Sequence, residues 1–95
     1  MGVPRQVLVA QSVDLGTSIT AYMCSAQVHH PYLVGVVFAD AKGRFADGAT
    51  IRTSPIRRVF ELSGFWVCET FRGSVYVVCN WAHEDTPLTN HGVVH

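Results

Sequence analysis

Short runs of β-branched and aromatic residues alternate with glycine- or proline-containing turns along most of the chain. The runs occupy residues 7–13, 17–24, 32–38, 50–54, 56–62, 65–71 and 74–81. Because they are strand-length and recur at intervals of about ten residues, they favour an all-β, mainly antiparallel domain. We expect a small barrel or roll of about five to six strands. Helical periodicity is nearly absent, although one short helix over residues 54–60 is an alternative to a strand there.

The runs at 65–71 and 74–81 predict the clearest hairpin, with Arg72-Gly73 as a two-residue loop. The facing pairs on its apolar side are then Thr70 with Val75, Cys68 with Val77, and Trp66 with Cys79. A one-residue slip would exchange the two faces, so burial should select this register. The opposite face carries Phe65, Val67, Phe71, Tyr76 and Val78. Either a second layer of the domain covers these side chains, or they form a protein interface.

The chain of 95 residues has room for one hydrophobic core. Hydrophobic residues make up 48% of it and charged residues only 15%, which argues against intrinsic disorder. We expect a single β-rich domain over residues 1–82 and a polar, proline-interrupted tail over 83–95. No secretory leader or membrane-length apolar run is apparent, so a soluble, cytoplasmic protein is expected. Domains of this size are marginal alone, which makes a homodimer a further expectation.

Formal charges cancel, with seven Lys and Arg against seven Asp and Glu. A globally basic nucleic-acid binder and an acidic-tail protein are therefore disfavoured. The local balance differs, because residues 42–58 hold five cations and one acid, Asp47. The cations are Lys42, Arg44, Arg52, Arg57 and Arg58. They form a solvated strand face, a surface for an acidic protein, or a single-stranded nucleic-acid site in which Phe45 and Phe60 stack on bases.

Histidines and cysteines are the next candidates for chemistry. Cys24, Cys68 and Cys79 include no C-x-x-C pair, so we interpret them as buried thiols, with a disulfide or a reactive thiol as the alternative. The other groupings are Cys24 with His29 and His30, and His83 with His91 and His95. These spacings match no familiar zinc motif. We therefore expect surface histidines and no metal or other cofactor.

Catalytic motifs are missing as well. There is no G-x-S-x-G elbow, no phosphate-binding G-x-x-x-x-G-K and no G-x-G-x-x-G. Cys68 and Cys79 fall inside predicted strands, and Asp47 is explained by its turn with Gly48. The remaining paired carboxylates, Glu84 and Asp85, lie in the tail. We expect no enzymatic activity and assign no catalytic residue.

Two segments, residues 43–54 and 69–76, resemble small accessory proteins encoded by bacteriophages and prophages. The shared features are a turn, an Ile-x-Thr-Ser strand from Ile51 to Ser54, and a Gly-Ser-x-Tyr hairpin from Gly73 to Tyr76. The resemblance spans residues 43–80. It implies a protein that binds and blocks host machinery, such as CRISPR interference complexes or other immune systems. No catalytic residue carries over from it.

These observations predict a protein that acts by stoichiometric protein binding in the cytoplasm of a bacterial host, most concretely as an anti-CRISPR-like inhibitor. The partner would be a host protein or ribonucleoprotein complex, and the candidate contact residues are Lys42, Arg44, Arg52, Arg57, Arg58, Phe71 and Tyr76. Arginine suits this role because its planar guanidinium pairs bidentately with carboxylates. Aromatic side chains supply the anchors. The alternative function is single-stranded nucleic-acid binding through residues 42–58.

Overall fold

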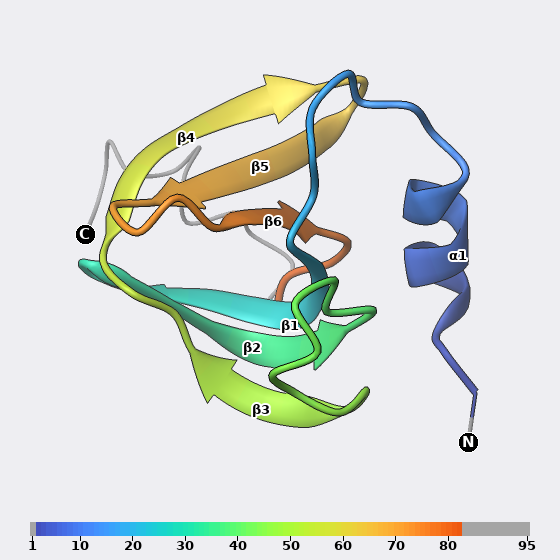
Figure 1. Cartoon of the computed structure of the whole chain (residues 1–95), viewed down its shortest axis with the longest axis horizontal. Helices are drawn as coiled ribbons and strands as arrows, with labels where there is room; N and C mark the ends of the chain where they lie inside the picture. The colour runs from blue at the N-terminus through green and yellow to red at the C-terminus, as the bar shows by residue number, and fades with distance from the viewer. Residues whose placement is uncertain (1, 83–95) are drawn as a thin grey trace.

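The computed structural model describes residues 2–82, which form one short helix and one sheet of six strands (Figure 1). The elements are α1 (Arg5–Gln11), β1 (Ala21–His29), β2 (Tyr32–Phe38), β3 (Ala49–Arg52), β4 (Ile56–Leu62), β5 (Phe65–Thr70) and β6 (Val75–Val78). The sheet order is β3-β2-β1-β6-β5-β4. All neighbours are antiparallel except β1 and β6, which are parallel. The all-β prediction with one short helix is confirmed, but the sheet is open rather than a closed barrel.

The sheet curls so that its two halves face each other, with β1 to β3 in one half and β4 to β6 in the other (Figure 1). The segment that connects β3 to β4 joins the two halves of the sheet at one end. Thr53 N donates to Leu33 O at 2.9 Å, and Ile56 N donates to Pro31 O at 2.7 Å. Both edge strands are therefore held against the start of β2, although they do not pair with each other.

The concave side of the sheet encloses the main core. Its buried members are Ala21, Met23, Ala26, Leu33, Val37, Ile51, Cys68, Tyr76 and Val78. Gly35 allows β1 and β2 to pack closely here, because a Cβ at this position would lie 3.0 Å from both Met23 Cγ and Cys24 O. Trp66 packs against the same core, as the hairpin prediction required.

Helix α1 packs on the other side of the sheet and buries Val7 and Ala10 completely. Val7 joins Cys24 and Phe38, while Ala10 joins a cluster with Val67 and Val77. The prediction of a strand at the start of residues 7–13 is wrong, since this segment lies in α1. Val7 and Ala10 are three positions apart, which places both side chains on the one buried face of the helix. The alternative helix over 54–60 is also wrong, since β4 occupies that segment. With seven residues, α1 is far too short for a bilayer span, and no suitable helix occurs elsewhere in residues 2–82.

The β5·β6 hairpin differs from the predicted register by one residue. Trp66 pairs with Val78, and Cys68 pairs with Tyr76. The loop has three residues rather than two, because Gly73 N donates to Thr70 O at 3.0 Å and Thr70 N donates to Ser74 O at 2.9 Å. Gly73 has a φ of 87°, which is the left-handed position of this loop type. As a result, Tyr76 and Val78 face the concave core, and Val77 faces the α1 side.

Candidate interaction surface

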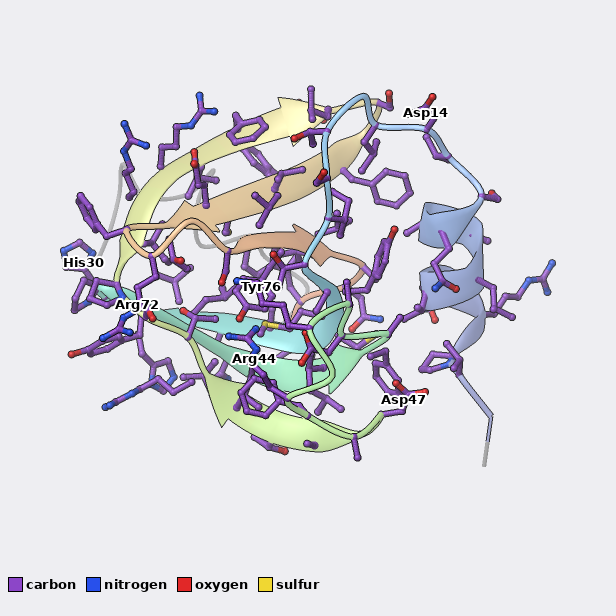
Figure 2. All side chains as sticks on the ribbon, viewed as in Figure 1. Asp14, His30, Arg44, Asp47, Arg72 and Tyr76 are labelled. Atoms are coloured by element: carbon purple, nitrogen blue, oxygen red, sulfur yellow. The ribbon has the colours of Figure 1, made fainter. Side chains whose placement is uncertain are left out.

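Four exposed arginines lie at the end of the sheet where the segment between β3 and β4 joins its two halves, and we call this region the arginine end. Its members are Arg52 on β3, Arg57 and Arg58 on β4, and Arg72 with Phe71 in the β5–β6 loop. The backbone holds these segments together, because Phe71 N donates to Pro55 O at 3.0 Å and Ile56 pairs with Thr70. Figure 2 shows Arg72 at the same end of the molecule as His30, whereas Asp14 and Asp47 lie at the opposite end.

Arg57 and Arg58 share a single carboxylate, that of Glu69 on β5. Arg58 Nε donates to Glu69 Oε1, and Arg57 Nη1 lies 3.7 Å from Glu69 Oε2. The hydrogen bond from Arg58 lowers the pKa of Glu69 most; desolvation opposes it, and the charges of Arg58 and Arg57 lower the pKa further. The arginine side chains remain 58% and 62% exposed. Two cations with one anion between them leave a net positive surface.

Two of these guanidinium groups also lie over aromatic rings. Arg52 Cζ is 4.4 Å from the centre of the Tyr32 ring, and Arg58 Cζ is 4.5 Å from the centre of the Phe60 ring. Cation–π contacts of this kind restrain the long arginine side chains without consuming their hydrogen-bond donors. Arg52 is an exposed residue whose guanidinium is restrained by Tyr32, which is favourable for bidentate binding of a carboxylate.

Phe71 is the most exposed large hydrophobic side chain in residues 2–82, at 69%. Its backbone is fixed by the hydrogen bond to Pro55 O, while its ring projects from the hairpin loop. An exposed aromatic ring at an end of the sheet that also carries arginines is typical of a protein-binding surface, where aromatic and arginine side chains supply most of the binding energy.

The other predicted contact residues form a separate group centred on Asp40. The Asp40 carboxylate accepts hydrogen bonds from the backbone N–H groups of Lys42, Arg44 and Phe45 at 3.1, 2.7 and 3.0 Å. Arg44 Nη2 donates to Tyr76 Oη at 3.3 Å, and Figure 2 shows these two side chains together. Tyr76 is only 3% exposed, so it belongs to the core and not to an open surface.

Lys42 completes this loop-anchoring group, since its Nζ donates to Ser74 Oγ at 3.4 Å. These contacts attach residues 40–45 to the start of β6. The cations of residues 42–58 are thus divided by their contacts: Lys42 and Arg44 anchor a loop, while Arg52, Arg57 and Arg58 belong to the arginine end. The contact residues predicted from the sequence do not include Arg72. Its position beside Phe71, in the loop that the hairpin pattern predicts, is the feature that could have identified it.

The thiols and imidazoles offer little chemistry in the described part of the chain. Burial raises the pKa of Cys68 to about 12, and burial together with the neighbouring Cys24 raises that of Cys79 to about 12, so both remain protonated near neutral pH. His29 Nε2 lies 2.8 Å from Gln27 Oε1 at the surface.

Metal-ligating side chains do not converge in residues 2–82, where no three of His, Cys, Asp and Glu lie close enough to hold an ion. His83, His91, His95, Glu84 and Asp85 fall outside the described residues, as does the predicted tail. Comparison of the chain with protein-family models, with curated proteins and with solved structures finds no match.

Proposed function

We propose that this protein acts without catalysis, by binding an acidic protein partner stoichiometrically through the arginine end. The observation that carries this proposal is the placement of exposed Arg52, Arg57, Arg58, Arg72 and Phe71 at one end of the sheet, with Glu69 as the one carboxylate paired to these arginines in residues 2–82. Arginines that are already restrained lose less side-chain entropy on binding, and an exposed aromatic ring supplies apolar contact.

The partner is expected to differ from this chain. In a two-fold symmetric dimer the same patch meets itself, which would bring the arginines of two copies together. Like charges placed face to face oppose association. A carboxylate-rich surface on another protein complements the arginine end and would also speed the encounter.

The most concrete form of this function is inhibition of a bacterial immune complex by a phage-encoded protein in the host cytoplasm. Its support is the resemblance of residues 43–54 and 69–76 to phage accessory proteins, and the second of these segments contains the Phe71–Arg72 loop. An anti-CRISPR-like protein would act by occupying a surface that the complex needs for its own substrate. The partner would then be a host protein or ribonucleoprotein complex.

Single-stranded nucleic acid is the alternative ligand, and the positions of Phe45 and Phe60, the two rings predicted to stack on bases, argue against it. Base stacking requires an open ring face. Arg44 lies 5.0 Å from the centre of the Phe45 ring, and Arg58 lies over Phe60, so each ring has a cation on one face. Phe45 also packs against the concave core.

Affinity capture from a bacterial lysate, with and without nuclease, tests the proposal. We expect a protein to be retained in an equimolar amount after nuclease treatment, and to remain bound as salt is raised through the physiological range. A nucleic-acid ligand would instead disappear with nuclease and weaken steeply with salt, because binding releases counterions from the phosphates. Recovery of nucleic acid alone, with no protein bound before or after nuclease treatment, would contradict the proposal.

A further inference from the structure

An open pocket of about 290 Å³ lies between α1 and the sheet, away from the arginine end. Its lining residues are Arg5, Gln6, Val9, Phe65 and Cys79. They come from three places in the fold: α1, the start of β5, and the residue after β6. Figure 1 shows α1 alongside the curved sheet, at the opposite side of the molecule from the labelled Arg72 in Figure 2.

Both sides of the pocket contribute an apolar part to its wall. Val9 is contributed by the helix, while Phe65 and Cys79 are contributed by the sheet. The Cys79 thiol is uncharged near neutral pH, because burial and the neighbouring Cys24 raise its pKa to about 12. An uncharged thiol behaves as a small hydrophobic group. This part of the pocket therefore suits a hydrocarbon chain or ring.

Arg5 brings a charge to this apolar pocket without a counter-ion. Within residues 2–82 it has no hydrogen bond, ion pair or aromatic contact, whereas Arg44, Arg52 and Arg58 each have such a partner. Gln6 beside it adds a neutral side chain that can donate and accept hydrogen bonds. A single cation next to apolar walls complements a ligand with one negative charge and an apolar body.

The exposed apolar side chains of α1 also favour a ligand with an apolar body. Val9 is 50% exposed although it is a large hydrophobic residue that lines the pocket. An apolar occupant of the pocket would remove part of this surface from water, which is favourable in proportion to the area covered. Leu8, at 54% exposure, is next to Val9 in sequence but does not line the pocket.

We propose that this pocket binds a small monocarboxylate with an aliphatic or aromatic body, whose carboxylate pairs with Arg5 and whose apolar part lies between Val9 and Phe65. The pocket volume of about 290 Å³ is at the lower limit for ligand sites, so the ligand is small. Guanidinium–carboxylate pairing supplies the orientation, and the apolar walls select against small hydrophilic acids.

Titration of the isotope-labelled protein with octanoate, followed by NMR, tests this assignment, with octan-1-ol as the uncharged probe of the same length. We expect saturable shifts centred on Gln6, Val9, Phe65 and Cys79, and octan-1-ol at least about tenfold weaker. Arg5→Gln should weaken octanoate about tenfold and leave octan-1-ol unchanged. Arg72→Gln, at another exposed arginine, should change neither.

A pair of matched tryptophan variants tests the location of the site. Val9→Trp should fill the pocket and abolish octanoate binding, whereas Leu8→Trp should leave binding intact, and both positions are exposed enough to accept the ring. Absence of saturable shifts, equal affinity for octanoate and octan-1-ol, or unchanged binding in Val9→Trp would overturn the proposal. Shifts at the same residues on raising the protein concentration alone would also overturn it, because a second copy would then cover the pocket.

Discussion

Arg58 and Glu69 lie directly opposite each other on β4 and β5, and Arg58 Nε donates a hydrogen bond to Glu69 Oε1. Arg57 approaches the other oxygen of the same carboxylate, at 3.7 Å. One acidic side chain thus positions two neighbouring arginines in the open. A carboxylate on β5 therefore restrains the two positively charged side chains on β4.

The pKa of Glu69 gives the first prediction. In the wild-type protein it should lie below the ordinary value for glutamate, about 4.3, mainly because of the hydrogen bond from Arg58. Arg58→Gln should raise it towards that value, while Arg72→Gln should leave it unchanged. An NMR titration of the Glu69 carboxyl carbon measures both effects, and an identical pKa in wild type and Arg58→Gln would show that the ion pair is absent in solution.

Phe71 should affect binding without affecting folding. Its ring is 69% exposed, so Phe71→Ala should change the free energy of unfolding by less than about 0.5 kcal/mol. The same substitution should weaken binding to the captured partner about tenfold or more if the ring is an anchor. Denaturant unfolding and calorimetric titration provide the two measurements. Leu8→Ala on α1 is the matched control, and an equal effect of both substitutions on affinity would remove Phe71 from the interface.

Asp40 should stabilise the loop over residues 40–45. Asp40→Ala leaves three backbone N–H groups without their acceptor, which should lower the free energy of unfolding by about 1–2 kcal/mol. Denaturant unfolding at neutral pH measures the loss. A change no larger than that of an exposed alanine substitution would contradict the role assigned to this carboxylate.

The same carboxylate predicts a pH dependence. Burial raises the pKa of Asp40, but the three N–H donors and Arg44 outweigh this and hold the pKa below its ordinary value. The stabilisation is then complete above the unfolded-state pKa of about 3.9 and is lost as the pH falls through the lower folded-state pKa. Below about pH 4 the wild type should lose stability faster than Asp40→Asn. Parallel curves for the two proteins would contradict the lowered pKa.

Gly35 should be intolerant of any side chain. A Cβ there would lie 3.0 Å from Cys24 O and from Met23 Cγ, so Gly35→Ala should lower the free energy of unfolding by about 1–3 kcal/mol and Gly35→Val by more. Gly2→Ala is the control, because nothing lies within 4 Å of its Cβ position. Equal free energies of unfolding for Gly35→Ala and Gly2→Ala would mean that β1 and β2 are farther apart than described.

Much of the sheet could be predicted from the sequence because its strands are short and separated by clear turn signals. The segments at 32–38, 56–62 and 65–71 lie within a residue or so of β2, β4 and β5. The parallel pairing of β1 with β6 could not be predicted, because it joins segments about fifty residues apart and no local pattern specifies it.

The register of the last hairpin could not be chosen by burial, since both of its faces are covered. Tyr76 and Val78 face the concave core, and Val77 faces the side packed by α1. The three-residue loop at Gly73 decided the register instead. The helix was missed because Val7, Leu8 and Val9 form an apolar run that also fits a strand, and only the spacing of Val7 and Ala10 after Pro4 favours a helix.

The candidate surface was predicted in part from local charge. Arg52, Arg57 and Arg58 are open and lie at one end of the sheet. Lys42 and Arg44 are close to them in sequence, but their contacts with Ser74 and Tyr76 are made across the fold, and such contacts are invisible in a charge count.

Capture by the variant Arg57→Glu/Arg58→Glu shows whether the arginine end is the surface that binds the partner. Wild type and variant would be compared on the same nuclease-treated bacterial lysate, with circular dichroism to verify folding and Arg5→Glu/Gln6→Glu as a control with a similar change of net charge. We expect the double charge reversal to abolish capture of the partner, while the control variant retains it. Undiminished capture by a folded Arg57→Glu/Arg58→Glu variant would contradict the claim that the arginine end is the binding surface.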